Sequence, residues 1–574
     1  MLIYSIISLI MSNAINNRRD SSILYSRACI FILICSLLIL YNNFYYNFII
    51  NGVILYNGLL CIENYIIIFV MFILILSTFI ISMNSVFPLK KIKYINLTLE
   101  SVFKNFKLKN YQKLLISDNN NVYNYDKIVK NYMSEQYRII EYPLIILFCI
   151  IGAIFLMSSF DIISIFLSIE LQSYALYLIC SIYRNSESSI SAGLTYFLLG
   201  GLSSCIILLG ISLLYINSGS TNLENLYIIN NISDIFTQSL SNNYNNLFID
   251  FIINKDNILF MEIYSSLFTQ YLYLQISLVI MSVGFLFKIS SAPFHFWSPD
   301  VYDAIPTIVT TFVAIIPKIS ITIFLYKLIY YTSSDIISLP WINNIILSSI
   351  LSLIIGSILG LTQYRIKRLY AYSTISHLGF ILLGLSINNL ESSKAMFFYI
   401  IQYSVSNLNA FIILICIAYT LRNYTINNNN NTNIKDTNYS PIQLLSQLKG
   451  YFNINPLIGI SLSITLFSFA GIPPLIGFFA KQMILTAAIN NGFIITTFIA
   501  IITSVISAVY YLVIVKMIFF DKSNFLLIHE ELLDKKNYSY IISSFYSFTI
   551  SIFTLLIILF IFFDQEILKL INII

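Results

Sequence analysis

The chain has 574 residues, of which 58% are hydrophobic and only 10% are charged, and its formal net charge is +5. Soluble domains carry about 25% charged residues, so this composition excludes an ordinary soluble protein and predicts a polytopic membrane protein. The basic residues lie in loops between apolar runs, as membrane topology alone would produce, so the positive charge does not indicate a nucleic-acid partner.

Apolar runs long enough to cross a bilayer recur along the whole chain. Hydropathy predicts fourteen spans, of which the first is marginal in length. The predicted spans are residues 1–15, 28–48, 60–83, 140–158, 161–183, 190–215, 270–289, 305–330, 343–361, 369–387, 393–421, 455–487, 491–518 and 541–563. We therefore expect an all-α polytopic membrane protein with about fourteen transmembrane helices.

Lysine and arginine concentrate in the loops that follow odd-numbered spans, whereas the loops after even-numbered spans hold essentially Lys255 alone. Ten of the odd-loop charges lie between Lys90 and Arg138. By the positive-inside rule the odd-numbered loops face the cytoplasm or the mitochondrial matrix, and both termini face the other side. The same set of loop charges includes Arg365, Lys367 and Arg368.

The segments outside the spans show no motif for a bound cofactor. The sequence has no G-x-G-x-x-G, Walker A or C-x-x-C pattern, and so gives no sign of a dinucleotide, ATP, zinc or iron–sulfur site. The long segments 84–139 and 216–269 and the asparagine-rich tract 426–433 show no catalytic pattern either. We interpret all three as surface or packing segments.

Four charged side chains remain well inside predicted spans: Glu170, Lys288, Lys318 and Lys481. A charge near the bilayer centre costs about 2.5–3.5 kcal/mol, so these residues indicate function. Burial disfavours a charged lysine while a nearby carboxylate favours it, and a lysine between these influences can switch protonation. We therefore predict a proton relay; the alternative is a Glu170–Lys288 pair that only locks two helices together. Lys327, near the end of its span, is expected to extend its head group to the interface.

Prolines accompany each of the three central lysines. Proline interrupts the hydrogen-bond ladder of a helix, and broken helices at membrane depth are tolerated where they line a polar cavity, as in transporters. We therefore expect broken helices here, in two similar halves, 140–330 and 343–518. The prolines are Pro293, Pro299 and Pro306 after Lys288, Pro317 beside Lys318, and Pro473 and Pro474 before Lys481.

The chain has three histidines, and histidine can carry protons near neutral pH. His377 lies inside the tenth predicted span, where a relay role and a packing role are equally compatible with the sequence. His295, at a predicted helix end, is expected to pack or to lie at the interface, and His529 lies in a loop. Asp300 and Asp303 stand next to a proline and are expected to cap or turn the chain.

Five stretches carry a family resemblance. They are SIELQSYALY, FKISSAPFHFWSPDVYDAIPT, IIPKI, QYRIKRLYAYSTISHLGFILLG and FAGIPPLIGFFAKQMIL. In this order, over roughly residues 140–520, they resemble the antiporter-like subunit 2 family of respiratory NADH:ubiquinone reductase (complex I). Its bacterial members are the N-type subunits, and the Mrp antiporters are related to it. With all early helices present, the chain is similar to the long mitochondrial form of fungi and protists.

The resemblance implies two inverted five-helix repeats, with helices 7 and 12 broken. The chain would then divide into helices 1–3 with a basic matrix-side insert (1–139), a first antiporter-like repeat (140–330), a second repeat (343–518), and a C-terminal loop with helix 14 (519–574).

The resemblance also assigns roles to single residues. Glu170 on helix five and Lys288 on helix seven would form a pair, Lys318 would be the central lysine of helix eight, and Lys481 the lysine of helix twelve. His377 on helix ten would lie beside the path.

The implied activity is proton translocation coupled to electron transfer from NADH to ubiquinone. No cofactor is implied on this chain, because NADH, FMN, the iron–sulfur clusters and ubiquinone bind other subunits of the complex. The implied partners are the other membrane-arm subunits and the lipid bilayer of the mitochondrial inner membrane. Two alternatives stay open: a free-standing cation/proton antiporter, and a passive scaffold within the membrane arm.

Overall fold

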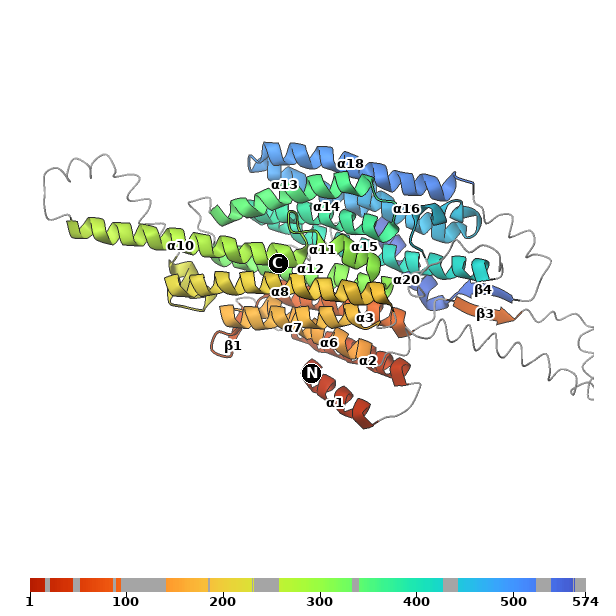
Figure 1. Cartoon of the computed structure of the whole chain (residues 1–574), viewed down its shortest axis with the longest axis horizontal. Helices are drawn as coiled ribbons and strands as arrows, with labels where there is room; N and C mark the ends of the chain where they lie inside the picture. The colour runs from red at the N-terminus through yellow and green to blue at the C-terminus, as the bar shows by residue number, and fades with distance from the viewer. Residues whose placement is uncertain are drawn as a thin grey trace, which may run out of the picture.

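The structure of the chain is a computed structural model, and nearly all of its described residues lie in helices. It describes residues 1–15, 21–44, 52–85, 89–93, 141–183, 186–229, 231, 258–332, 340–426, 442–522, 538–560 and 562. In this part of the chain the only sheets are two antiparallel strand pairs. One is the hairpin of β1 (Val53–Leu55) and β2 (Leu60–Ile62), and the other joins β3 (Leu89–Lys93) to the distant β4 (Tyr538–Ile542). The helices run side by side in one bundle (Figure 1). The predicted all-α membrane fold is confirmed.

A helix occupies each predicted span, and the twelfth span is occupied by two pieces. The helices are α1 (Leu2–Ile15), α2 (Ser21–Phe44), α3 (Asn64–Ser85), α6 (Glu141–Ser158), α7 (Ile162–Ser181), α8 (Glu187–Ser218), α10 (Ile258–Ile289), α11 (Trp297–Ala304), α12 (Thr307–Thr332), α13 (Pro340–Leu361), α14 (Ile366–Ile387), α15 (Leu390–Ile426), α16 (Pro456–Ala470), α17 (Ile476–Asn490), α18 (Ile494–Phe519) and α20 (Ser544–Ile558). Two 3-10 turns, Leu445–Leu448 and Tyr451–Asn453, precede α16. Among the described residues, 10 helices are long and apolar enough to cross a membrane, and the other apolar helices are shorter. The number of fourteen crossings therefore stays a prediction.

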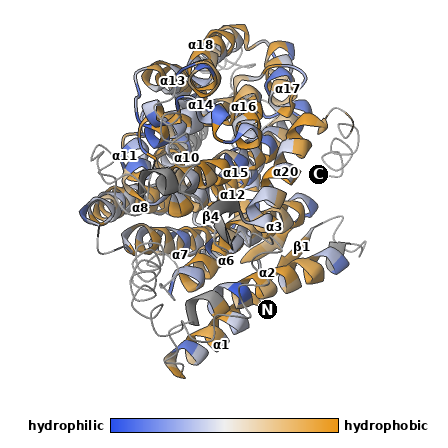
Figure 2. Cartoon of the chain, turned by 90° about the vertical axis from the view of Figure 1, so that its right-hand side faces the viewer, coloured by the Kyte–Doolittle hydropathy of each residue, from blue (hydrophilic) through white to orange (hydrophobic). Residues whose placement is uncertain are grey.

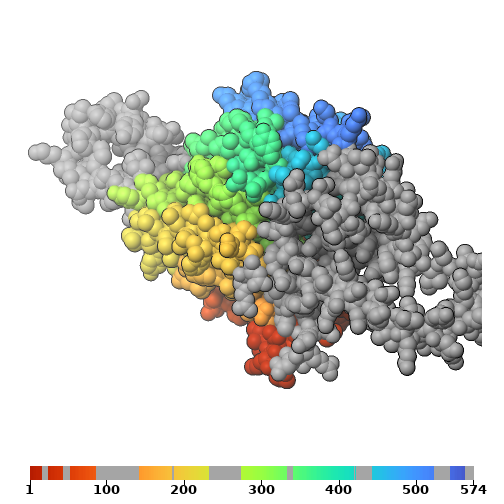
Figure 3. Space-filling view, turned by 45° about the vertical axis from the view of Figure 1, so that its right-hand side comes forward, coloured from red at the N-terminus to blue at the C-terminus, as the bar shows by residue number. Residues whose placement is uncertain are grey.

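Helix α12 forms the centre of the bundle. Its apolar stretch is completely buried, and those of α14 and α15 are nearly so. In the end-on view α12 and α15 lie inside, while α1 and α18 lie at opposite edges (Figure 2). The outer helices are apolar on their outward side as well, with exposed side chains such as Leu194 and Phe498. A soluble protein would show polar faces there, so the outer surface fits a lipid surround. The space-filling view shows the same order, from the N-terminal helices to α18 (Figure 3).

Two helices are interrupted, at the prolines that follow Lys288 and at those that precede Lys481. Helix α12 continues through Pro317, so the expectation of a break beside Lys318 was wrong. The first break separates α10 from α11 and begins at Ser290, with φ 67°; the second separates α16 from α17 and begins at Gly471, with φ 82°. At both breaks the next amide bonds back to a carbonyl inside the helix, from Ser291 to Leu286 and from Ile472 to Phe467, each at 3.1 Å. This is the Schellman pattern of helix ends, in which a left-handed residue is required.

Two glycines allow corresponding helix pairs to pack closely. A Cβ atom on Gly152 of α6 would lie 2.7 Å from the amide nitrogen of Gln172 on α7. A Cβ atom on Gly356 of α13 would lie 2.7 Å from the amide nitrogen of Ser376 on α14. The sequence separation within the two pairs is the same, so α6–α7 and α13–α14 pack alike. Glu170 and Thr374 then hold equivalent places, each two residues before the contacted residue.

Replacing Gly356 by alanine is expected to destabilise the chain. The added methyl group would press on backbone atoms of α14 that no rotamer change can move, and overpacking of this kind costs about 1–3 kcal/mol. The measurement is the melting temperature of the detergent-solubilised protein or its complex. Gly201→Ala is the matched control, because nothing lies within 4 Å of a Cβ on Gly201. Equal melting temperatures of the two variants would contradict the close contact.

Several sequence predictions were wrong in detail. Helix α10 begins at Ile258, inside the segment 216–269 that was predicted as a loop. Lys367 and Arg368 belong to the first turn of α14 rather than to a loop, and Lys367 is buried. Most of the segment 84–139, most of the tract 426–433 and His529 lie outside the described residues.

Candidate functional site

Glu170 and Lys288 form a buried ion pair between α7 and α10. The Lys288 Nζ lies 2.9 Å from the Glu170 Oε1, and the two side chains are 7% and 13% exposed, respectively. Lys288 is the penultimate residue of α10, directly before the break at Ser290. The second carboxylate oxygen of Glu170 accepts a long hydrogen bond of 3.5 Å from Ser173. The predicted partners are therefore in contact, and their contact lies next to the break between α10 and α11.

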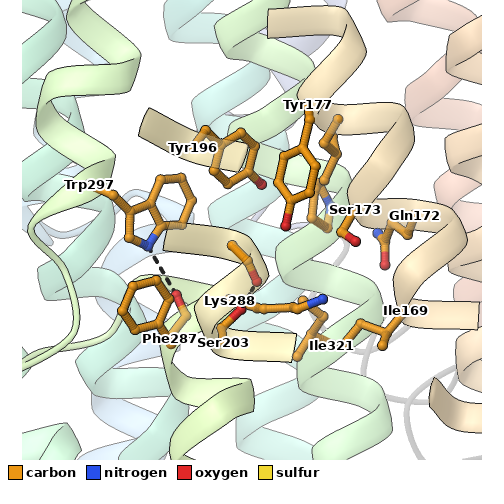
Figure 4. Close-up of a pocket in the computed structure, with 13 residues that line it drawn as sticks. Ile169, Gln172, Ser173, Tyr177, Tyr196, Ser203, Phe287, Lys288, Trp297 and Ile321 are labelled. Atoms are coloured by element: carbon orange, nitrogen blue, oxygen red, sulfur yellow. Dashed lines mark hydrogen bonds between the residues drawn. The ribbon is translucent and has the colours of Figure 1, made fainter. Parts of the chain in front are cut away.

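A pocket opens beside the Lys288 amine. It is lined by α7, α8, α10, α11 and α12, with polar groups from Gln172, Ser173 and Ser203, and is wide enough for a water molecule. The Tyr177 and Tyr196 rings and the Trp297 indole close it on the other side (Figure 4). The indole nitrogen donates a 3.0 Å hydrogen bond to the Phe287 carbonyl, which fixes α11 to the end of α10.

Lys318 lies in the middle of α12, one residue after Pro317. Its side chain is 4% exposed, and its Nζ donates a 2.9 Å hydrogen bond to the Thr374 hydroxyl on α14. The Tyr302 ring of α11 lies 5.5 Å from the same nitrogen. Thr374 occupies the place on α14 that Glu170 occupies on α7. The first lysine therefore faces a carboxylate, and the central lysine faces a neutral hydroxyl.

Lys481 lies beyond the second break, on α17. Its Nζ donates to the carbonyl oxygens of Phe469, at 2.9 Å, and Ala470, at 3.0 Å. These are the last residues of α16, whose carbonyls lack partners within the helix, and the negative end of the helix dipole favours a cation there. The Phe380 ring lies 5.6 Å away. Within the described part of the chain, neither Lys318 nor Lys481 forms an ion pair.

His377 stands between these two lysines on α14, one turn after Thr374. Lys481 and Lys318 are the charged groups whose fields reach its ring. The Nδ1 atom lies 2.7 Å from the Tyr399 hydroxyl, and the Nε2 atom lies 3.3 Å from the Tyr511 hydroxyl. With both ring nitrogens in hydrogen-bond contact, the imidazole can accept a proton on one side and donate one on the other.

His295 and the two aspartates lie apart from this line of residues. His295 is buried in the first break, with its Nδ1 atom 3.2 Å from the Pro293 carbonyl, which fits the predicted packing role. Asp300 and Asp303 lie within α11, and the prediction that they cap or turn the chain was wrong. They form ion pairs with Arg368 and Arg365 at the start of α14, so they join α11 to α14.

Sequence reasoning missed two buried lysines. The Lys327 side chain on α12 is 0% exposed and donates a 2.9 Å hydrogen bond to the Ser159 carbonyl, so the expectation that it extends to the interface was wrong. Lys367 donates a 2.6 Å hydrogen bond to the Ile305 carbonyl at the end of α11. A second lysine in the span of Lys318 was a usable signal for Lys327. The arginines beside Lys367 gave it the pattern of a loop residue.

The transmembrane-domain model of the NADH:quinone oxidoreductase/Mrp antiporter family matches residues 159–507. The chain belongs to this family. It is 42% identical over 521 residues to NADH-ubiquinone oxidoreductase chain 2 of Rhizopus oryzae, covering 91% of this chain and 86% of that one. It is 34% identical to NADH-quinone oxidoreductase subunit N of Pelagibacter ubique, covering 76% and 78%. The resemblance indicated by the five motifs is thereby confirmed.

Solved structures share the fold of the chain. A chain of respiratory complex I from Thermus thermophilus superposes with a TM-score of 0.66 at 19% identity, covering 99% of this chain and 97% of that one. A chain of the Mrp complex from Dietzia gives a TM-score of 0.66 at 14% identity, covering 100% and 95%. The same architecture therefore occurs in a respiratory complex and in an antiporter complex.

Proposed function

We propose that the chain is a core membrane-arm subunit of proton-pumping NADH:ubiquinone reductase, with the other membrane-arm subunits as partners. It conducts protons across the mitochondrial inner membrane while NADH, FMN, iron–sulfur clusters and ubiquinone react in other subunits. The observation that carries this proposal is the series of buried groups Glu170, Lys288, Lys318 and Lys481, placed at two helix breaks and on the central helix between them. Membership of the family supports it.

The two breaks belong to two antiporter-like repeats, residues 140–330 and 343–518. The N-terminal part, 1–139, and the C-terminal part, 519–574, flank them. The matching contacts of Gly152 and Gly356 support this division. The basic loops face the matrix, and both termini face the intermembrane space, because lysine and arginine are retained on the inner side.

Proton movement starts with the Glu170–Lys288 pair. Ubiquinone reduction elsewhere changes the electric field at one end of the chain, and the pair opens or tightens. When it opens, Lys288 loses the carboxylate that favours its charged form, and its proton moves through Lys318 towards Lys481. His377 lies between the last two groups and is a possible relay.

The energies of this scheme are compatible. Moving one charge against 100 mV costs about 2.3 kcal/mol. A change of two pKa units at one group corresponds to about 2.7 kcal/mol. A change of this size at one group would therefore suffice to move one proton against a membrane potential of 100 mV.

A native gel of mildly solubilised membranes tests the assignment to a complex. The chain is expected to migrate with a large assembly that stains for NADH oxidation. Migration alone, or in an assembly without this activity, would favour the free-standing antiporter, which family membership alone also allows. Cation flux would then be the quantity to measure.

A further inference from the structure

Lys327 is a buried lysine that the proposed relay does not use. Among the described residues its Nζ has one hydrogen bond, to the Ser159 carbonyl at 2.9 Å, and it lies 5.0 Å from the centre of the Phe160 ring. No carboxylate within the described part of the chain lies in ion-pair distance of it. An ammonium group has three N–H donors and is costly to bury when few are satisfied. A buried amine with few hydrogen-bond partners and no ion pair can both hold a proton and release it, so Lys327 can take part in proton transfer.

The surroundings of Lys327 lead to the surface beside the β1–β2 hairpin. Tyr331 stands one turn further along α12, on the same face of the helix. Its hydroxyl donates a 3.1 Å hydrogen bond to the Oε1 atom of Glu63, and its ring packs edge-on against Phe160, with the centroids 5.0 Å apart. Glu63 precedes α3 and is partly exposed. Glu63, a carboxylate that is in contact with water, therefore bonds to a residue that packs against Phe160, the ring beside the Lys327 amine.

Other ionisable groups face this cluster. The Cys61 thiol lies 3.6 Å from Glu63, and the field of Glu224 also reaches this thiol. Tyr65 and Tyr326 pack edge-to-face beside it, with their centroids 5.6 Å apart. Glu63 is the carboxylate that hydrogen-bonds within the cluster, whereas Glu224 is exposed.

In the other direction, Lys327 shares a face of α12 with Ser320, two turns earlier. Ser320 and Gln172 exchange hydrogen bonds of 2.9 and 3.2 Å across α12 and α7. Gln172 lines the pocket beside Lys288 and stands two residues after Glu170. Polar groups therefore extend from the Glu170–Lys288 pair to the face of α12 that carries Lys327, about 10 Å along the helix from Ser320.

We propose that Lys327 and Glu63 form a proton port that connects the Glu170–Lys288 pocket with the water beside the β1–β2 hairpin. On this second route, beside the one through Lys318, Lys327 passes a proton to the Glu63 carboxylate and is protonated again over water from the Glu170–Lys288 pair, and Glu63 releases its proton to the solvent. An N–H bond of Lys327 breaks as an O–H bond of Glu63 forms, an N–H bond of Lys288 breaks as that of Lys327 is restored, and the O–H bond of Glu63 breaks as the proton joins solvent water. No other reactant is needed. The inference rests on the proposed function, and it gives the first repeat its own way to the side opposite the basic loops.

Lys327→Arg in the assembled complex tests the port. Arginine keeps the positive charge and can donate to the Ser159 carbonyl, but it does not lose its proton. We expect membrane vesicles with this variant to oxidise NADH normally with a water-soluble acceptor, while proton translocation driven by ubiquinone reduction falls well below that of the unchanged complex. If Lys327 only holds the Ser159 carbonyl in place, the arginine variant will translocate protons normally, which would overturn the proposal.

Glu63→Gln is the second variant, and it decides the matter if arginine prevents assembly. The amide oxygen still accepts the Tyr331 hydrogen bond but carries no proton, so we expect the same loss of translocation. Normal translocation in this variant would overturn the port. Glu224→Gln is the matched control, because it removes a carboxylate from the same side without touching the proposed route, and it should translocate normally.

The outcome is distinguishable from a failure of the proposed function. Normal translocation after Lys318→Ala would refute the buried relay as a whole. A loss after Lys318→Ala together with normal Lys327→Arg and Glu63→Gln complexes would refute the port alone.

Discussion

A chain that carries both Glu170→Gln and Lys288→Met is expected to assemble but not to translocate protons. Removing one partner of a buried ion pair leaves an unpaired charge and costs about 3–5 kcal/mol, whereas replacing both by neutral groups is often neutral or stabilising. The single variants should therefore reduce the amount of assembled complex, and the double variant should restore it. The measurement pairs the amount of complex on a native gel with proton translocation in vesicles.

This experiment separates the relay from the alternative in which the pair only locks α7 to α10. A structural lock predicts that translocation returns together with assembly in the double variant. A relay predicts that assembly returns and translocation does not, because the group that carries the proton is gone. Glu187→Gln, at an exposed position of α8, serves as the control for loss of a carboxylate. If the double variant translocates protons at the normal rate, the role proposed for Lys288 is refuted.

The fold could be predicted from sequence because lipid leaves few alternatives. Backbone groups in a bilayer must be satisfied internally, so each long apolar run forms a helix. The two breaks lie beside prolines, although α12 continues through Pro317. The start of α10 was missed because the prediction used apolar character as the mark of a helix. Residues 258–269 include Glu262 and Gln270 follows them, so the run loses its apolar character while the helix continues. Hydropathy identifies the part of a helix that is embedded in lipid, whereas a helix can continue outside the lipid.

The candidate site was predictable only as a set of residues. The cost of burying a charge singled out Glu170, Lys288, Lys318 and Lys481, but nothing in the sequence gives the acceptors of the last two. Lys318 contacts Thr374, and Lys481 contacts the carbonyls at the end of α16. These partners depend on how distant helices pack.

Lys327 and Lys367 were predicted to lie at the interface or in a loop, but both are buried. A lysine near the end of an apolar run has the same pattern whether its head group reaches water or a buried carbonyl. Lys327 meets the turn between α6 and α7, and Lys367 meets the end of α11. Both turns come from other parts of the chain, so only the three-dimensional packing distinguishes a buried lysine from an interfacial one.

Replacing Lys318 by arginine is expected to stop proton translocation as fully as replacing it by alanine. Lys318 is enclosed between α11 and α14, and its Nζ donates a hydrogen bond to the Thr374 hydroxyl. Arginine keeps a positive charge next to Thr374 and the Tyr302 ring, but it cannot release a proton. A relay needs the release, whereas a structural cation needs only the charge. The measurement is ubiquinone-driven proton translocation, with NADH oxidation by a water-soluble acceptor as the readout of assembly.

Thr374→Ser is the matched control, since it keeps the hydroxyl that accepts from Lys318 and should translocate normally. If both Lys318 variants assemble and translocate normally, the chain is a passive scaffold and its sister subunits carry the protons. If alanine abolishes translocation while arginine preserves it, Lys318 acts through its fixed charge, and the proton passes beside it rather than through it. Only loss in both variants places the proton on Lys318 itself, because charge is the property that the two substitutions do not share.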